Sequence, residues 1–120
     1  MKKILIADDR SEVVELVKVT LEGEGYQTID ASDGREALEK IGKEKPDLIL
    51  LDIIMPRMDG FEVLSKVKKD PKTKDIPVIM LTAKGQKIDK EKGGILGAQD
   101  YIIKPFSPSR LLRKIEEILA

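Results

Sequence analysis

Short apolar runs recur along the chain, separated by longer stretches in which apolar residues repeat at helical spacing. Four runs are almost uniformly apolar, and one near residues 26–29 is weaker. The runs are Ile4–Ala7, Tyr26–Ile29, Leu48–Leu51, Val78–Leu81 and Tyr101–Ile103. Each is too short for a surface helix, and a run without polar alternation is typical of a strand buried on both faces. The pattern therefore predicts five strands.

Helical patterns fill the intervals between these runs. In each of them, apolar residues three or four positions apart give a helix one apolar face. Four such patterns follow Ser11, Asp33-Gly34, Asp59 and Ser107, and the two serines are candidate helix caps. The pattern after Ser107 is the clearest, because Pro108 takes the first helical position, where its missing N–H is not needed.

One further stretch, residues 85–98, is a poorer helix candidate. It contains Gly93, Gly94 and Gly97, and glycine lowers helix stability in the interior of a helix. We expect this helix to be short or mobile. Taken together, strand and helix alternate five times, which predicts parallel β-α-β units with helices on both faces of the sheet. The expected fold is one doubly wound α/β domain over residues 1–120.

Composition narrows the functions open to such a domain. Twenty-two basic residues balance twenty-two acidic ones, which argues against direct binding of nucleic acid. The chain has neither cysteine nor histidine, so disulfides, thiolate metal sites and any role for a histidine of its own are excluded. No apolar stretch is long enough for membrane insertion. We expect a cytoplasmic protein whose partners are recognised by local patches.

Polar side chains end most of the apolar runs. Asp8 and Asp9 follow the first run, Asp52 the third, Thr82 the fourth and Lys104 the fifth. Ligands of an open parallel sheet bind outside the carboxyl ends of its strands. Three carboxylates there form a hard-oxygen site of the kind that Mg²⁺ accepts, while the ammonium and the hydroxyl suit a phosphoryl group. Asp52 could act as a nucleophile, since carboxylates form aspartyl-phosphates.

Each of these residues also has an ordinary structural explanation. A single aspartate after a strand is most often a helix cap, and a single lysine is nearly always a solvated surface side chain. The second run leads to Asp30, which is open to the same explanation. Independent caps and surface residues would not tend to supply a cation site, a nucleophile, a donor and an ammonium at one edge. Their coincidence favours a functional site.

Four motifs in this order resemble those of a response-regulator receiver domain, the phospho-acceptor half of two-component signalling. They are Asp8-Asp9, the segment Leu50–Gly60, Leu81-Thr82-Ala83 and Lys104-Pro105-Phe106. The resemblance covers essentially the whole chain. It implies a flavodoxin-like (βα)5 fold with a five-stranded parallel sheet in the order 2-1-3-4-5.

The resemblance also implies a role for each residue of the acidic edge. Asp52 would be the phosphorylated aspartate. Asp9 would bind Mg²⁺ directly, Asp8 through water, and the backbone carbonyl of Ile54 would complete the protein ligands, with Mn²⁺ as an alternative metal. Ile54 and Lys84 would flank the path of the hydrolytic water, so that an apolar Ile54 would slow the loss of phosphate.

Three residues around the fifth strand would form the switch. By the resemblance, Lys104 pairs with the phosphoryl group, Thr82 moves to hydrogen-bond it, and Tyr101 swings inward behind Thr82. The bond between Lys104 and Pro105 would be cis, a rare geometry that aims the ammonium into the site. Binding would then change on the face made of the fourth helix, the fifth strand and the fifth helix.

The implied partners are proteins. A sensor histidine kinase or a histidine phosphotransfer protein would donate the phosphoryl group, and an unknown downstream protein would read the switched surface. The domain would assist its own phosphorylation and dephosphorylation without being an enzyme in the usual sense. Because the predicted elements fill residues 1–120, we expect a stand-alone receiver without an output domain, or a piece of a longer regulator.

Three other readings remain open from the sequence. A phosphohydrolase of the haloacid-dehalogenase type also uses an aspartyl-phosphate, but its nucleophile lies in an Asp-x-Asp pattern after the first strand, where this chain has Asp8-Asp9-Arg10. A nucleotide-binding module needs a glycine-rich phosphate loop, which this chain lacks. A degenerate receiver would bind partners without phosphorylation, although the full set of charged positions argues against it.

Overall fold

The computed structural model describes residues 1–83, 92, 94 and 96–120. Most of the helix expected at 85–98 lies outside the described residues, as does Lys84. In chain order the described elements are β1 (Lys3–Ala7), α1 (Ser11–Gly23), β2 (Gln27–Ala31), α2 (Gly34–Glu44), β3 (Leu48–Asp52), α3 (Gly60–Lys69), β4 (Val78–Ala83), β5 (Asp100–Lys104) and α5 (Pro108–Leu119). Every apolar run identified in the sequence contributes to a strand.

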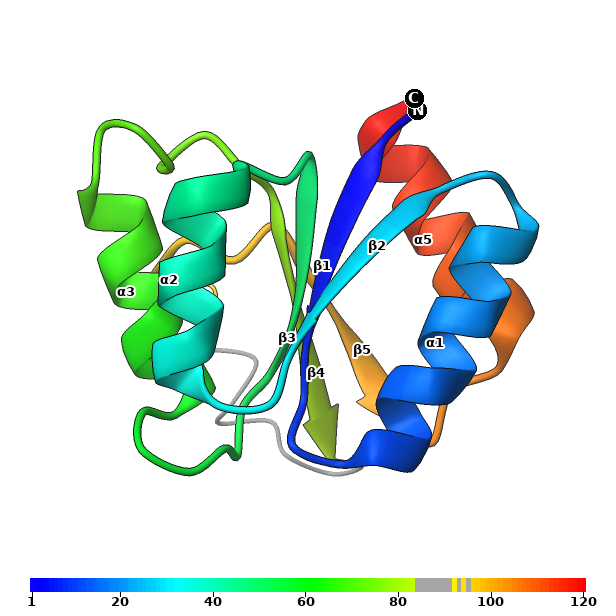
Figure 1. Ribbon diagram of the computed structural model, residues 1–120, viewed down its shortest axis with the longest axis horizontal. Helices are drawn as coiled ribbons and strands as arrows, with labels where there is room; N and C mark the ends of the chain where they lie inside the picture. Colours follow the sequence, from blue (N-terminus) through cyan, green and yellow to red (C-terminus); the bar gives the residue numbers. More distant parts are fainter. Residues whose placement is uncertain (84–91, 93, 95) are drawn as a thin grey trace.

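The strands form one sheet in the order β2-β1-β3-β4-β5, and every neighbouring pair is parallel. Helices α2 and α3 cover one face, and α1 and α5 cover the other (Figure 1). The predicted doubly wound, flavodoxin-like fold is therefore confirmed. Within the part of the chain that the structure describes, no helix is both long and apolar enough to cross a membrane.

Burial on both faces explains why the strand sequences lack polar alternation. In β1, Leu5 and Ala7 join the core beneath α2 and α3, whereas Ile4 and Ile6 join the core beneath α1 and α5. The four residues of β3 that precede Asp52 are divided between the two cores in the same way. Removing such side chains from water is the main stabilising contribution to the fold. The same packing fixes where each strand ends, and so positions the polar residues that follow.

The helix starts agree with the sequence in all but one case. The Asp59 carboxylate accepts the N–H of Glu62 at 2.9 Å, and the Ser107 hydroxyl accepts that of Arg110 at 3.2 Å. The prediction that Ser11 caps the first helix is wrong.

Arg10 holds the N-cap position of α1 and makes no side-chain cap hydrogen bond. The Asp8 carboxylate accepts the N–H of Arg10 at 3.0 Å, and this bond turns the chain before the helix begins. Ser11 is therefore already helical, and the turn that starts α1 also fixes the side chain of Asp8.

Candidate functional site

All the strands end at the same side of the molecule, opposite the two termini (Figure 1). Asp52 is the last residue of β3 and Lys104 the last of β5, while Thr82 lies one residue before the end of β4. Asp8 directly follows β1, and Asp9 comes next in the chain. The register of a parallel sheet thus brings the polar residues predicted from the sequence to one edge.

Three carboxylates meet at this edge. One oxygen each from Asp8, Asp9 and Asp52 lies within 4.8 Å of the other two. Asp8 is 1% exposed and Asp52 is 9% exposed, whereas Asp9 faces solvent. Clustered carboxylate oxygens open to water on one side are the donors that Mg²⁺ uses in proteins, so the cluster fits a hard divalent cation.

Lys104 is the cation that the structure places against these carboxylates. Its Nζ lies 2.7 Å from Oδ2 of Asp8 and 3.2 Å from Oδ1 of Asp52. Because β5 is the edge strand and β1 and β3 lie inside the sheet, the side chain has to reach inward across the end of β4. One ammonium is therefore shared by two buried carboxylates, and the cluster as a whole keeps an excess of negative charge.

The pKa of Asp52 reflects this imbalance. Burial raises the pKa of the carboxyl group above its ordinary value, and the neighbouring charge of Asp8 raises it further. The ammonium of Lys104 acts in the opposite direction through its charge and its hydrogen bond, without cancelling the rise. An additional positive charge at the cluster would lower the free energy of the ionised form.

The loop after Asp52 is held close to that residue. Gly60, the first residue of α3, donates its N–H to the carbonyl of Ile53 at 2.7 Å. A Cβ atom at Gly60 would lie 2.8 Å from the Cα of Ile53, so this approach requires glycine. The Ile54 side chain points to solvent and is 77% exposed.

The predicted switch residues lie on β4 and β5. Thr82 is 2% exposed and its Cα is paired with that of Ile103. Tyr101, on β5, is 38% exposed. The peptide bond between Lys104 and Pro105 is cis. Thr82 thus lies on the strand next to β3, which ends at Asp52.

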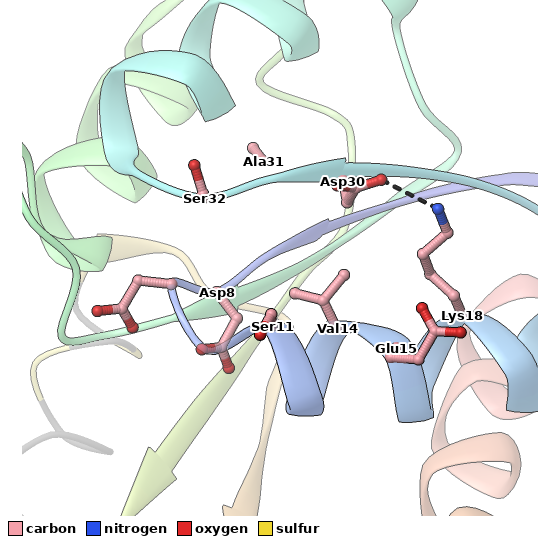
Figure 2. A pocket seen from close by; sticks show the side chains of 9 residues that line it. Asp8, Ser11, Val14, Glu15, Lys18, Asp30, Ala31 and Ser32 are labelled. Carbon is pink, nitrogen blue, oxygen red and sulfur yellow. Dashed lines mark hydrogen bonds and ion pairs between the residues drawn. The ribbon is translucent and has the colours of Figure 1, made fainter.

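A cavity of about 250 Å³ adjoins the carboxylate cluster between the start of α1 and the end of β2 (Figure 2). Asp8 lies at one side of it, and an ion pair between Lys18 and Asp30 lies at the other (Figure 2). Asp30 ends the second apolar run of the sequence, but its carboxylate is 3.2 Å from Lys18 and does not belong to the acidic cluster. Asp30 and Lys18 therefore form a surface ion pair.

Sequence reasoning missed two contacts near the site. The first is the bond that the Asp8 carboxylate accepts from the N–H of Arg10, for which an aspartate two residues before the N-cap position was the available signal. The second joins the loop after Asp52 to the start of α2, where Arg57 lies 3.6 Å from Asp33. No local pattern in the sequence indicates this second contact.

A five-stranded parallel sheet in this order, with an acidic cluster and a lysine at its carboxyl edge, defines the class of flavodoxin-like receiver folds. The family model described as the response regulator receiver domain matches residues 4–116, and the chain belongs to this family. Receiver domains are generally Mg²⁺-dependent and interact with histidine kinases or phosphotransfer proteins. The chain is thus a receiver domain of two-component signalling.

Curated relatives and solved structures agree with this assignment. The chain is 47% identical to the alkaline phosphatase synthesis transcriptional regulatory protein PhoP of Bacillus subtilis, over 98% of this chain and 48% of that protein. It is 45% identical to the phosphate regulon transcriptional regulatory protein PhoB of Pseudomonas aeruginosa, over 98% and 52%. The chain spans about half the length of these curated relatives.

Among solved structures, the chemotaxis response regulator CheY4 of Vibrio cholerae superposes with a TM-score of 0.93 at 37% identity, covering 98% of each chain. The chain therefore resembles both a single-domain regulator and one part of longer ones.

Proposed function

We propose that Asp52 accepts a phosphoryl group from a phosphohistidine of a separate protein, either a sensor histidine kinase or a histidine phosphotransfer protein. The observation that carries this proposal is the placement of Asp52, with Lys104 3.2 Å away and with Asp8 and Asp9 in the same cluster. A carboxylate that lies beside an ammonium group and beside carboxylates suited to bind a cation is itself suited to receive an anionic group.

The transfer needs no acid or base from this chain. An oxygen of the Asp52 carboxylate forms a bond to phosphorus while the bond from phosphorus to the histidine nitrogen breaks, and the nitrogen keeps the electron pair. The ammonium of Lys104 would stabilise charge on the phosphoryl oxygens, since phosphoryl transfer depends mainly on positioning and electrostatics. This chain takes part in its own phosphorylation and dephosphorylation, and we do not assign it a separate enzymatic turnover.

The acidic cluster would hold Mg²⁺, or Mn²⁺ in its place, through Asp8, Asp9, Asp52 and the backbone carbonyl of Ile54. The donor set supports this, because it consists of hard oxygens with one side open to water. When bound, the cation would supply positive charge next to the phosphoryl oxygens. Because the cluster already carries excess negative charge, a cation is needed before the anionic phosphoryl group can be accommodated.

Phosphorylation would act on the rest of the domain through charge. A phosphoryl group carries roughly 1.5 to 2 negative charges at neutral pH. Thr82 would hydrogen-bond it, Tyr101 would turn inward, and the face formed by the fourth helix, β5 and α5 would change its affinity for a downstream protein. To shift from about 1% to 99% active, the group must favour the active state by about 5.5 kcal/mol.

The test is the intact mass of the protein after incubation with acetyl phosphate, with and without Mg²⁺. We expect one phosphoryl group on the wild type in the presence of Mg²⁺ and none on Asp52→Asn. The matched control is Asp30→Asn, which changes another aspartate near a strand end and should be phosphorylated as the wild type is.

Two results would count against the proposal. Equal phosphorylation of Asp52→Asn would place the acceptor elsewhere, and no adduct with either acetyl phosphate or a phosphorylated histidine protein would indicate a degenerate receiver. Sustained hydrolysis of a small phosphoester would instead favour a phosphohydrolase. A downstream protein partner and a cytoplasmic location belong to the same proposal.

A further inference from the structure

The start of α2 packs against the loop that follows Asp52. We call residues 53–59, which connect β3 to α3, the acceptor loop. In Figure 1 the first turn of α2 and the acceptor loop lie side by side at the end of the molecule that carries the acidic cluster. Gly34 of α2 lies directly against the backbone carbonyl group and the Cβ atom of Met58 in the loop.

There is no room for a side chain at this contact. A Cβ atom at Gly34 would lie 2.7 Å from the carbonyl carbon of Met58 and closer still to its oxygen. Backbone atoms cannot rotate away as the end of a flexible side chain can, so either the loop or the helix would have to shift. Gly34 does not have a positive φ, so it is the close approach that requires glycine here.

The acceptor loop has a backbone conformation that needs such support. Arg57 has a φ of 69°, which is unfavourable for a residue with a side chain. The N–H of Met58 donates to the carbonyl of Pro56 at 2.8 Å, closing a tight turn around Arg57. Strained turns of this kind persist only where the surrounding structure holds them.

A side chain of the same helix end also contacts this turn. Asp33 caps α2 with one carboxylate oxygen, which accepts the N–H of Glu36 at 2.8 Å. Its other oxygen lies 3.6 Å from the guanidinium of Arg57. The start of α2 therefore holds the acceptor loop at two successive residues, once by close packing and once by charge.

We infer that Gly34 is a positioning residue for the divalent-cation site: its close fit against Met58 holds the acceptor loop where the carbonyl of Ile54 can serve as a ligand. The inference rests on the proposed function, since that function makes Ile54 a ligand. Ile54 lies between Asp52, which the sheet fixes, and the turn at Arg57, which α2 fixes. Displacing the turn would move the carbonyl relative to the carboxylates.

The test compares Gly34→Ala with Gly42→Ala. Both glycines lie in α2, but a Cβ atom at Gly42 has nothing within 4 Å, so this control changes helix propensity without changing a contact. Affinity for MgCl₂ is measured by titration calorimetry on both variants and the wild type. We expect about tenfold weaker binding for Gly34→Ala, the effect typical of residues that orient metal ligands. Gly42→Ala should bind as the wild type does.

A second measurement does not involve the metal. Amide hydrogen exchange of Gly60 in the metal-free protein reports the bond from its N–H to the carbonyl of Ile53 at the base of the loop. Exchange should be faster in Gly34→Ala than in Gly42→Ala. If Gly34→Ala does not fold, Met58→Gly removes the Cβ atom that forms the side-chain part of the same contact, and it should show the same two changes.

The outcomes separate the inference from the proposed function. If the wild type binds Mg²⁺ and the variants at Gly34 and Met58 match Gly42→Ala in both measurements, the inference is overturned while the proposed function stands. If the wild type does not bind Mg²⁺, the cation site of the proposed function fails and the inference fails with it. Weaker Mg²⁺ binding together with faster exchange of Gly60 supports the inference.

Discussion

Two lysine–carboxylate pairs at neighbouring strands show what distinguishes a functional cluster from a surface ion pair. Lys104 lies 2.7 Å from Asp8, whose side chain is fully buried. Lys18 lies 3.2 Å from Asp30, and both of these side chains are well exposed. Asp8 directly follows β1 and Asp30 lies in β2, and these two strands are adjacent in the sheet. The two pairs differ in burial and in the number of carboxylates that form an ion pair with the lysine.

Charge balance is the main lesson of this comparison. Asp30 forms an ion pair with Lys18, and its hydrogen bond and charge, followed by the weaker charges of Glu22 and Glu15, raise the pKa of Lys18. Lys104 instead faces two carboxylates, and the pKa of Asp52 remains raised by burial and by Asp8 despite the ammonium. The exposed pair is complete in itself. The buried cluster has fewer positive than negative charges. This imbalance is the property expected of a site that binds a cation and then a phosphoryl group.

The largest effect on stability should come from breaking the buried cluster. Lys104→Met removes the shared cation and leaves Asp8 and Asp52 facing each other, so we expect the metal-free protein to lose about 3 kcal/mol of unfolding free energy. Urea unfolding at neutral pH measures this. Lys18→Met is the matched control and should cost far less, because exposed pairs contribute little. Equal losses in the two variants would contradict the comparison.

Mg²⁺ should stabilise the protein through the cluster alone. At 100 times its dissociation constant, a ligand that binds only the folded state adds about 2.7 kcal/mol to the unfolding free energy. We expect this gain for the wild type and for Asp30→Asn. Asp9→Asn should lose it, although this substitution keeps the ion pairs of Lys104 with Asp8 and Asp52. An unchanged thermal midpoint of the wild type in saturating Mg²⁺ would be evidence against the cation site.

Removing one charge from the crowded cluster should stabilise the metal-free protein. Because the folded-state pKa of Asp52 is raised, the folded protein holds a proton that the unfolded chain has lost, and stability falls as pH rises from the ordinary aspartate range through the folded-state pKa. Asp52→Asn abolishes this loss. We expect a gain on the order of 1 kcal/mol at neutral pH, as for other functional residues that cost stability.

Unfolding of wild type and Asp52→Asn over a pH series measures this effect. The gain should vanish in acid, where Asp52 is protonated in both states. Asp30→Asn, which removes an aspartate with a lysine partner of its own, should not be stabilised. A gain for Asp30→Asn as large as that for Asp52→Asn would show that burial of the cluster is not the cause.

The smallest effect on stability should come from the exposed residue beside the cluster. Ile54→Gln changes a side chain that is 77% exposed, so the unfolding free energy should change by less than about 0.5 kcal/mol. A polar group there should shorten the lifetime of the phosphorylated form, because it can orient the hydrolytic water. Val19→Gln, at an exposed apolar residue of α1, is the control and should leave the lifetime unchanged.

Much of the fold follows from the sequence, because the three inner strands, β1, β3 and β4, are buried on both faces and their runs are therefore almost uniformly apolar. Residues at the ends of these runs had to meet at one edge, which predicted the grouping of Asp8, Asp9, Asp52 and Lys104. The order of the strands came from the family resemblance. Apolar runs alone do not specify which strands are neighbours.

Contacts between distant segments were beyond the reach of sequence patterns. Ser11 looked like a helix cap, but Ser11 is already the first helical residue and Arg10 holds the N-cap position, after a turn that Asp8 closes. The requirement for glycine at position 34 arises from Met58, twenty-four positions later in the sequence. Asp30 could be separated from the acidic cluster only once Lys18 was placed beside it.

The most direct test of the account is a crystal structure of the protein with Mg²⁺ and beryllofluoride, which mimics a phosphoryl group on a carboxylate. We predict beryllofluoride bound to a carboxylate oxygen of Asp52, in contact with Lys104, and Mg²⁺ among Asp8, Asp9 and Asp52. Beryllofluoride bound at another carboxylate, or an acidic cluster that keeps Lys104 as its sole cation at saturating Mg²⁺, would contradict the central claim.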